Sequence, residues 1–241
     1  PVHTAWSVDA GGVGATLGPE EATRFARGEE VIATSGQPVR LGQPLDWIAI
    51  TDHSDMMGAI SEIKAGNPEM LADPTIKRWH DMFAGSPVEA RKAVMELIKA
   101  QATKQLPPVI IDSKFAKSIW EKNTVIAEKY NEPGRFTAFI GYEWTSSPGG
   151  GDNLHRNIIY RDNKDKADRV LPYTTFQSEN PEDLWKWMSE WEKPAGGKLL
   201  AIPHNGNLSN GRMFAMTTFS GDSLTKAWAD ARQRWEPLFE A

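Results

Sequence analysis

The stretch Leu45–Asp46–Trp47–Ile48–Ala49–Ile50–Thr51 runs directly into Asp52–His53–Ser54–Asp55. Its apolar residues predict a short buried strand, and the abrupt change to polar residues marks the carboxyl end of that strand. Because the carboxyl ends of parallel strands gather on the active face of α/β proteins, we expect Asp52 and His53 to lie in a functional site.

The residues on either side of this stretch alternate between helical and strand patterns. The pattern predicts helices over 19–28, 86–105, 113–130, 182–192 and 222–235, and strands over 136–145, 155–160 and 198–203. This alternation is typical of an α/β fold with a parallel sheet or barrel, here as a single domain over 1–241. Residues from about 56 to 131 are mainly helical and long for a simple crossover. We therefore expect them to form, in part, a helical insertion beside the site.

The composition narrows the class of protein. Of the 241 residues, 40% are hydrophobic and 24% charged, as in an ordinary soluble globular protein, and the net charge of −5 argues against a nucleic-acid partner. No apolar run approaches the roughly 20 residues that a membrane span requires. The absence of cysteine excludes thiolate metal sites and cysteine nucleophiles, so any transition metal must be held by histidine and carboxylate groups. A cysteine-free chain is compatible with the bacterial cytoplasm or periplasm, which leaves the compartment open.

Histidines and carboxylates lie at the ends of several predicted elements. A lone histidine on an apolar strand is more often a core residue than a ligand, but four at element ends, with a carboxylate on an apolar strand, favour a metal site. The fifth histidine, His80, lies within a helical stretch, where we expect it to pack or face solvent. The predicted metal ligands are His3, Asp9, His53, Glu143, His155 and His204.

The motifs around these residues resemble a known series. His3–Thr4 with Ser7 and Asp9, then 48–53, 141–143 and 203–204, resemble the PHP domain, which is named for polymerases and histidinol phosphatases. The longer context, at 17–22, 45–47, 142–145 and 155–157, is similar to a bacterial PHP-like family catalogued only as a domain of unknown function. The resemblance extends over essentially the whole chain.

This resemblance implies a fold and a set of ligands. The fold would be a distorted (β/α)7 barrel, incomplete here at its C-terminus, that holds two or three zinc, manganese or iron ions. His3 would hold the first metal, Glu143 would bridge the first and second, His155 and His204 would complete the second, and Asp9 and His53 would serve a third. Asp52, which we group with Glu143 and His53 as catalytic, would orient its neighbours.

The implied activity is hydrolysis of a small-molecule phosphate ester by a metal-activated hydroxide. Arg156 and Asn205 are the predicted substrate contacts. A second hypothesis is a metal hydrolase of the amidohydrolase type, although those barrels use a lysine on a core strand and here only Lys198 lies near one, at its edge. A third is a metal-binding or structural PHP relic without activity. The substrate, the identity of the metal and the oligomeric state stay open.

The sequence departs from the resembling family at two positions. Pro1 stands where the family has the first histidine of His-x-His, and no late Asp-x-His precedes Ala241. We therefore expect the chain to be a fragment, cut at both ends, of a longer protein.

Overall fold

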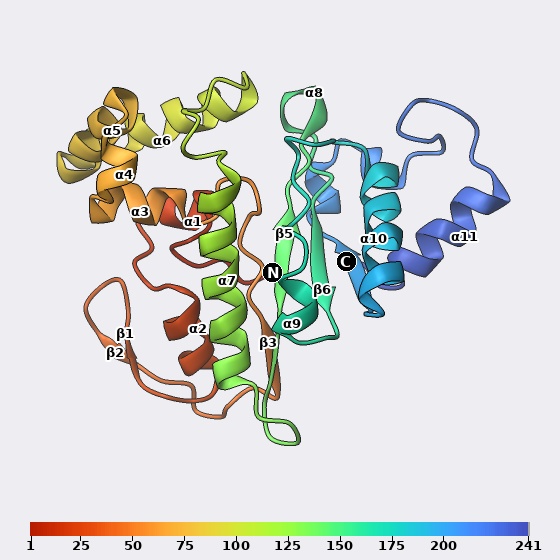
Figure 1. Cartoon of the computed structure of the whole chain (residues 1–241), viewed down its shortest axis with the longest axis horizontal. Coiled ribbons are helices and arrows are strands. Elements are labelled where there is room, and N and C mark those ends of the chain that lie inside the picture. The colour runs from red at the N-terminus through yellow and green to blue at the C-terminus, as the bar shows by residue number, and fades with distance from the viewer. Residues whose placement is uncertain (241) are drawn as a thin grey trace.

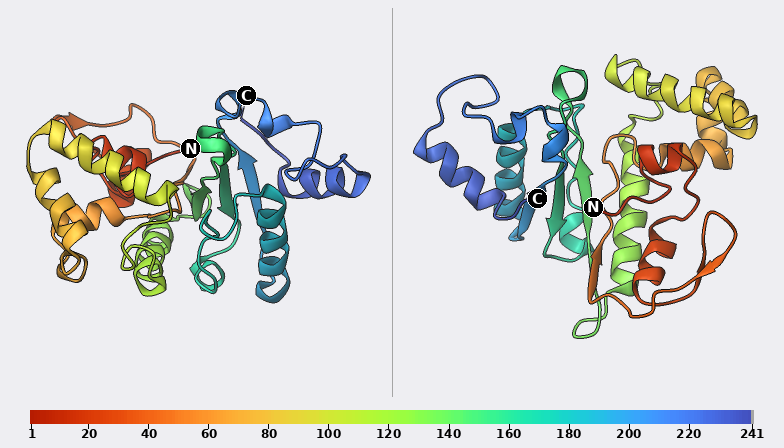
Figure 2. Two further views of the ribbon diagram at one scale, coloured as in Figure 1. Left: turned by 90° about the horizontal axis from the view of Figure 1, so that it is seen from above. Right: turned by 180° about the vertical axis from the view of Figure 1, so that it is seen from behind.

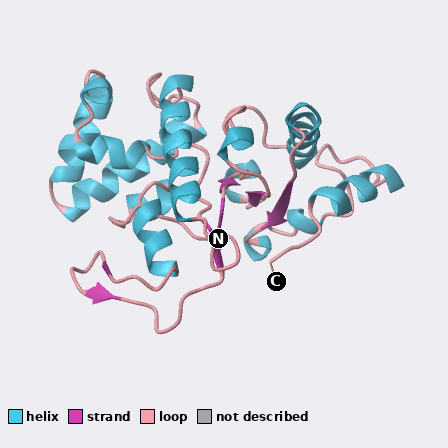
Figure 3. Cartoon of the chain, turned by 60° about the horizontal axis from the view of Figure 1, so that its bottom comes forward, coloured by secondary structure: helices cyan, strands magenta, loops and turns pink. Residues whose placement is uncertain are grey.

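The computed structural model describes residues 1–240. Helices outnumber strands, and the strands are short segments that lie between them (Figure 3). The strands are β1 (Val31–Ile32), β2 (Pro38–Val39), β3 (Trp47–Ala49), β4 (Thr137–Phe139), β5 (Gly141–Trp144), β6 (Arg156–Tyr160) and β7 (Leu199–Pro203). The helices are α1 (Val8–Gly12), α2 (Pro19–Ala26), α3 (Ala59–Ala65), α4 (Pro68–Leu71), α5 (Pro74–Ala84), α6 (Pro87–Ala102), α7 (Ser113–Tyr130), α8 (Pro148–Gly151), α9 (Lys164–Ala167), α10 (Pro181–Ala195) and α11 (Lys226–Trp235), with 3₁₀ turns η1 (Gly206–Leu208) and η2 (Arg212–Phe214).

The central strands form two small sheets that meet at an isolated bridge between His53 and Glu143. β3 pairs with β4 in parallel, whereas β5, β6 and β7 pair antiparallel in that order. The parallel pairing continues beyond the named strands, because the backbone N–H of Glu143 donates to Asp52 (2.9 Å) and that of Ser54 donates to Glu143 (2.8 Å). The end of β3 therefore lies beside β5, next to the antiparallel part of the sheet.

The expectation of a (β/α)7 barrel is wrong. The seven strands form small sheets, and none of them closes into a barrel within residues 1–240. The connection between β5 and β6 spans only 145–155 and contains the four-residue helix α8. A parallel return needs a longer crossover than this, so β6 runs back antiparallel to β5.

Two groups of helices lie on opposite sides of the sheet. In Figure 1 the N-terminal helices α1 to α6, red to yellow, lie to the left of β5 and β6, and α10 and α11, blue, lie to the right. The views in Figure 2 agree with this separation. Among the described residues, no helix is both long and apolar enough to cross a membrane.

Alternation along the strands of the antiparallel sheet decides which side chains face the main core. Successive side chains of a strand point to opposite faces, so Tyr142 and Trp144 face one side and Glu143 the other. On the first side, Tyr142 and Trp144 are fully buried with Ile158 and Tyr160 in a cluster formed with α7 and α10. The opposite face, which carries Glu143, does not pack on this core and can therefore carry a functional site.

Residues 56–131 contain five helices, α3 to α7. α3 to α6 bury a separate apolar cluster, in which Ile63, Ile76, Trp79 and Leu97 are almost fully buried. α6 begins with a capping box, in which Ser86 Oγ accepts from Glu89 N–H and Glu89 accepts from Ser86 N–H. α7 instead packs on β4 and α2 and joins the parallel strands β3 and β4.

Helix α11 is attached to the sheet by a buried ion pair. Glu236, just after α11, accepts from Arg156 Nε at 3.0 Å and from Trp185 Nε1 at 2.8 Å, and it also lies 3.2 Å from Arg232 Nε. The side chains of Arg156 and Glu236 are 3% and 1% exposed. Neither charge can turn to water if the other is removed.

We expect Glu236→Ala to lower the free energy of unfolding by about 3–5 kcal/mol, because it leaves the Arg156 guanidinium buried without its partner. Urea denaturation followed by circular dichroism measures this change. The matched control is Asp230→Ala, which removes an exposed ion pair with Lys226 on the same helix and should cost at most about 1 kcal/mol. Equal losses in the two variants would contradict a structural role for the buried pair.

Candidate metal centre

The sheet brings four chain segments together at one end. His53 follows β3, Glu143 lies near the end of β5, His155 precedes β6, and His204 follows β7. Because β6 runs antiparallel to β5, its beginning lies beside the end of β5, and His204 N–H donates to His155 C=O at 3.0 Å. The antiparallel topology therefore explains why His155 reaches the centre from the start of its strand.

Glu143 is the middle of the cluster. Its side chain has no exposed surface, yet three histidines approach its carboxylate. His155 Nδ1 lies 2.7 Å and His53 Nδ1 3.4 Å from Oε1, and His3 Nε2 lies 3.0 Å from Oε2. His53, Glu143 and His155 form a group whose ligand atoms are spaced for one metal ion.

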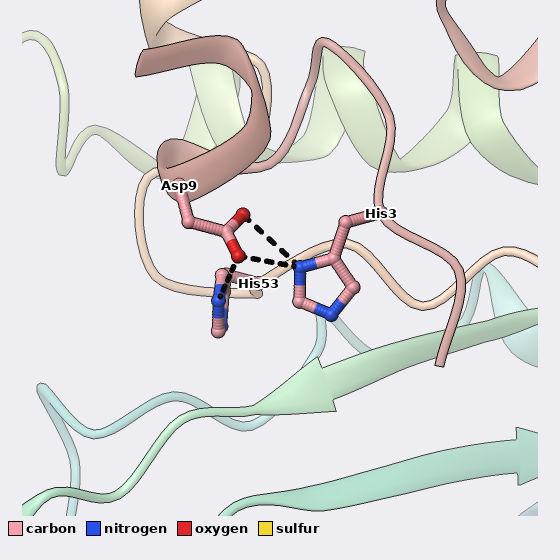
Figure 4. A group of neighbouring side chains, drawn as sticks. All are labelled: His3, Asp9 and His53. Carbon is pink, nitrogen blue, oxygen red and sulfur yellow. Dashed lines mark hydrogen bonds and ion pairs between the residues drawn. The ribbon is translucent and has the colours of Figure 1, made fainter. Parts of the chain in front are cut away.

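A second group shares His53. His3 Nδ1 lies 3.0 Å from each carboxylate oxygen of Asp9, and His53 Nε2 lies 3.4 Å from Asp9 Oδ2 (Figure 4). The rings of His3 and His53 are nearly perpendicular, with centroids 4.6 Å apart. His3, Asp9 and His53 are therefore also spaced for a metal ion, at the more exposed side of the cluster.

The hydroxyl of Thr145 bears on which ring nitrogen of His53 carries the proton and which has a lone pair for a metal ion. Thr145 Oγ1 donates its single proton to the backbone oxygen of Glu143 at 3.1 Å and lies 2.6 Å from His53 Nδ1. A hydroxyl that donates to this backbone oxygen accepts from His53 Nδ1–H, and that arrangement leaves the lone pair on Nε2. In that arrangement His53 Nε2 could ligate a metal ion together with His3 and Asp9, which lie near the N-terminus.

The fit of a cation is also supported by buried atoms without hydrogen bonds. Glu143 Oε1 and His155 Nδ1 approach each other, but neither makes a hydrogen bond of acceptable geometry within the described residues. Buried polar atoms without partners are unfavourable, and a divalent cation ligated by both would satisfy them. Histidine nitrogen and carboxylate oxygen are donors that suit zinc, manganese and iron.

The charges of the cluster shift one another's protonation. Burial alone lowers the pKa of His3, but the carboxylates of Asp9 and Glu143 outweigh it and raise that pKa to about 10. Burial alone raises the pKa of Asp9 and of Glu143, and the neighbouring histidines hold both pKa values well below their usual range. Burial lowers the pKa of His155. The carboxylates are thus ionised and His155 is neutral, as metal ligation requires, whereas His3 must lose its proton before it can ligate a metal.

Asp52 positions the N-terminal segment. Its buried carboxylate accepts from the backbone N–H of Thr4 at 2.5 Å and from Thr4 Oγ1 at 2.7 Å. Burial raises the pKa of Asp52 to about 6, despite these hydrogen bonds. Asp52 belongs to neither metal group, and its contacts fix the residue that follows His3.

The remaining predicted site residues lie at the margin of the cluster. His204 Nδ1 contacts Glu240 Oε2, and the backbone N–H of Asn205 donates to the same oxygen at 3.2 Å. Arg156 points away from Glu143, because its position in β6 places it on the opposite face, where it binds Glu236. His80, expected to pack, donates to Ile63 C=O at 2.7 Å and lies outside both groups.

The sequence analysis did not include three polar contacts of the cluster. Thr145 contacts His53, Ser147 Oγ lies 3.0 Å from His155 Nε2, and Glu240 contacts His204. Thr145 and Ser147 follow Glu143 closely in the chain, and this short polar run after an apolar strand is the signal that could have indicated them. Glu240 is distant in sequence, and nothing in the sequence marks it.

We expect Thr145→Val to weaken metal binding about 10–100-fold, because the valine no longer holds the His53 ring in the ligating tautomer. Competition with a fluorescent chelator measures the affinity. Thr145→Ser keeps the hydroxyl and should restore most of it. An unchanged affinity in the valine variant would remove the proposed role of this hydroxyl.

Comparison with known proteins gives the chain a family but no activity. Searches of the curated proteins and of the solved structures returned no significant match. The family described as "Protein of unknown function (DUF3604)" matches residues 1–241, the whole length of the sequence. The chain therefore belongs to the DUF3604 family of proteins of unknown function.

Proposed function

We propose that this chain is a metal-dependent hydrolase of the phosphoesterase type. The observation that carries the proposal is the fully buried carboxylate of Glu143, approached by His3, His53 and His155. A structural ion pair needs one partner, whereas this carboxylate has three imidazoles from three distant chain segments. Such convergence is typical of a site for divalent cations.

The resemblance of the motifs to the PHP domain supports the same reaction class. In that reaction water attacks phosphorus, the bond from phosphorus to the ester oxygen breaks, and the released alcohol oxygen takes up a proton. Divalent ions, when bound, lower the pKa of water and neutralise charge on the phosphoryl oxygens.

The residues of the chain itself orient the ligands and hold their protons. Thr145 Oγ1 contacts His53 Nδ1 and Ser147 Oγ contacts His155 Nε2, so each ring is held by a hydroxyl. Asp52 fixes Thr4 and thereby places His3 against Glu143. These contacts pre-arrange the site, so that little reorganisation accompanies metal binding.

The amidohydrolase hypothesis receives less support. It requires a lysine beside the metals, but Lys198 Nζ lies 3.0 Å from Glu192 Oε2 and is about half exposed. The two groups of potential metal ligands that share His53 weaken the purely structural form of the relic hypothesis, but not its metal-binding form. Turnover by the metal-loaded protein distinguishes the enzyme from the relic.

The first test is the metal content of protein purified without chelator. We expect one to three ions of zinc, manganese or iron per chain by mass spectrometry, and a sharp reduction in Glu143→Gln, because the amide loses the charge that holds the cations. His53→Ala should lose metal likewise, whereas His80→Ala, a histidine outside the cluster, should retain it.

The second step is a phosphoester screen with metal added back. Turnover that is lost in Glu143→Gln and kept in His80→Ala would support the phosphoesterase. Metal binding without turnover on any phosphoester would favour the relic. Protein that takes up no added metal would overturn the proposal.

A further inference from the structure

A large apolar pocket borders the segment that carries His53. Its volume is about 530 Å³, within the range of small-molecule sites. Ser54, Met56 and Met57 form one side, the connection between α6 and α7 forms a second, and residues 171–177 form the third. The apolar lining includes Met57, Leu106, Ile110, Phe115, Leu171 and Phe176.

The far wall of the pocket is fastened to the segment that follows His53. Asp55, which is fully buried, accepts from Thr175 N–H at 3.0 Å and from Thr175 Oγ1 at 2.7 Å. Ser54 Oγ donates to Tyr173 C=O at 3.3 Å, while Ser54 N–H donates to Glu143 C=O. The segment that supplies a metal ligand therefore also holds both sides of the pocket in place.

The mouth of the pocket exposes apolar surface. Ile111 is 52% and Phe176 37% exposed, although both are large hydrophobic residues. Lys104 is the one charged residue that lines the pocket within residues 1–240. Met56 and Lys104 both have positive φ, 62° and 55°, which is unfavourable for residues other than glycine and asparagine.

We propose that this pocket binds the apolar part of the substrate, an aromatic or branched hydrocarbon group carried by the ester that the metal centre cleaves. The substrate class is therefore a phosphate ester of a hydrophobic alcohol rather than of a sugar. A sugar would need many hydroxyl partners, and this lining offers few. Methionine side chains such as Met56 and Met57 adapt to apolar groups of varied shape. Lys104, at the rim, attracts an anionic ligand.

The proposal rests on the proposed function, but direct binding tests the pocket without turnover. The probe is 2-naphthol, titrated by calorimetry into chelator-treated protein. Ala116→Trp places a large ring in the pocket from an exposed position on α7 and should weaken binding by about tenfold or more, the loss expected when an aromatic group is kept out of an apolar site. The matched control is Val125→Trp, on the same helix, 51% exposed and outside the pocket, which should leave binding unchanged.

A kinetic comparison separates the pocket from the metal centre. For the metal-loaded protein, Ala116→Trp should raise KM for 1-naphthyl phosphate more than KM for methyl phosphate, and Val125→Trp should change neither. If 2-naphthol binds and neither ester is cleaved, the pocket stands and the phosphoesterase proposal fails. If both esters are cleaved and Ala116→Trp changes neither KM nor 2-naphthol binding, the pocket proposal is overturned and the phosphoesterase stands. Absence of saturable binding to the unmodified chain also overturns it.

Discussion

Burying the carboxylate of Glu143 is costly by several kcal/mol unless its charge is compensated, and most of the site follows from how the fold meets this requirement. The compensation comes from His3, His53 and His155, which belong to the N-terminal segment, the end of β3 and the start of β6. Each histidine must reach the same carboxylate, so the positions of three separate chain segments depend on one buried charge. Removing Glu143 would leave three imidazoles facing an apolar strand end.

The N-terminal segment lies within the sheet's hydrogen-bonding network as well as in the site. Thr51 N–H donates to Val2 C=O, and Asp52 binds Thr4 on the other side of His3. His3, which contacts Glu143, is thus held in place through both of its neighbours, Val2 and Thr4, by the segment that leads from β3 to His53. The same contacts therefore pair the backbone and position the ligand His3. A change in the register of β3 would displace both the N-terminal segment and His3.

The sequence was sufficient for the longer helices and the main strands, but not for the short elements such as β1, β2 and α8, nor for the pairing of the strands. The strand before His53 and the helices begun by Pro19, Pro87 and Pro181 were predicted because periodicity and capping are local signals. The antiparallel direction of β6 was not predicted, because it depends on how the chain packs after the short connection from β5. Val88 and Ile98 are apolar but exposed, because α6 packs with Ala93, Val94 and Leu97. The pocket, made by three segments within 54–57, 104–120 and 171–177 that are far apart in the chain, left no mark in the sequence.

The contact between His3 and Glu143 joins residues separated by 140 positions. Bringing such distant residues together costs chain entropy that nearby contacts do not. The helical cluster of α3 to α6 can assemble from neighbouring residues, whereas the ligand set is complete only after β5 and the start of β6 are in place. During synthesis His3 leaves the ribosome before its partner Glu143 does. A metal ion can therefore bind the complete ligand set only in the assembled fold. It has no complete ligand set to bind before the chain has folded.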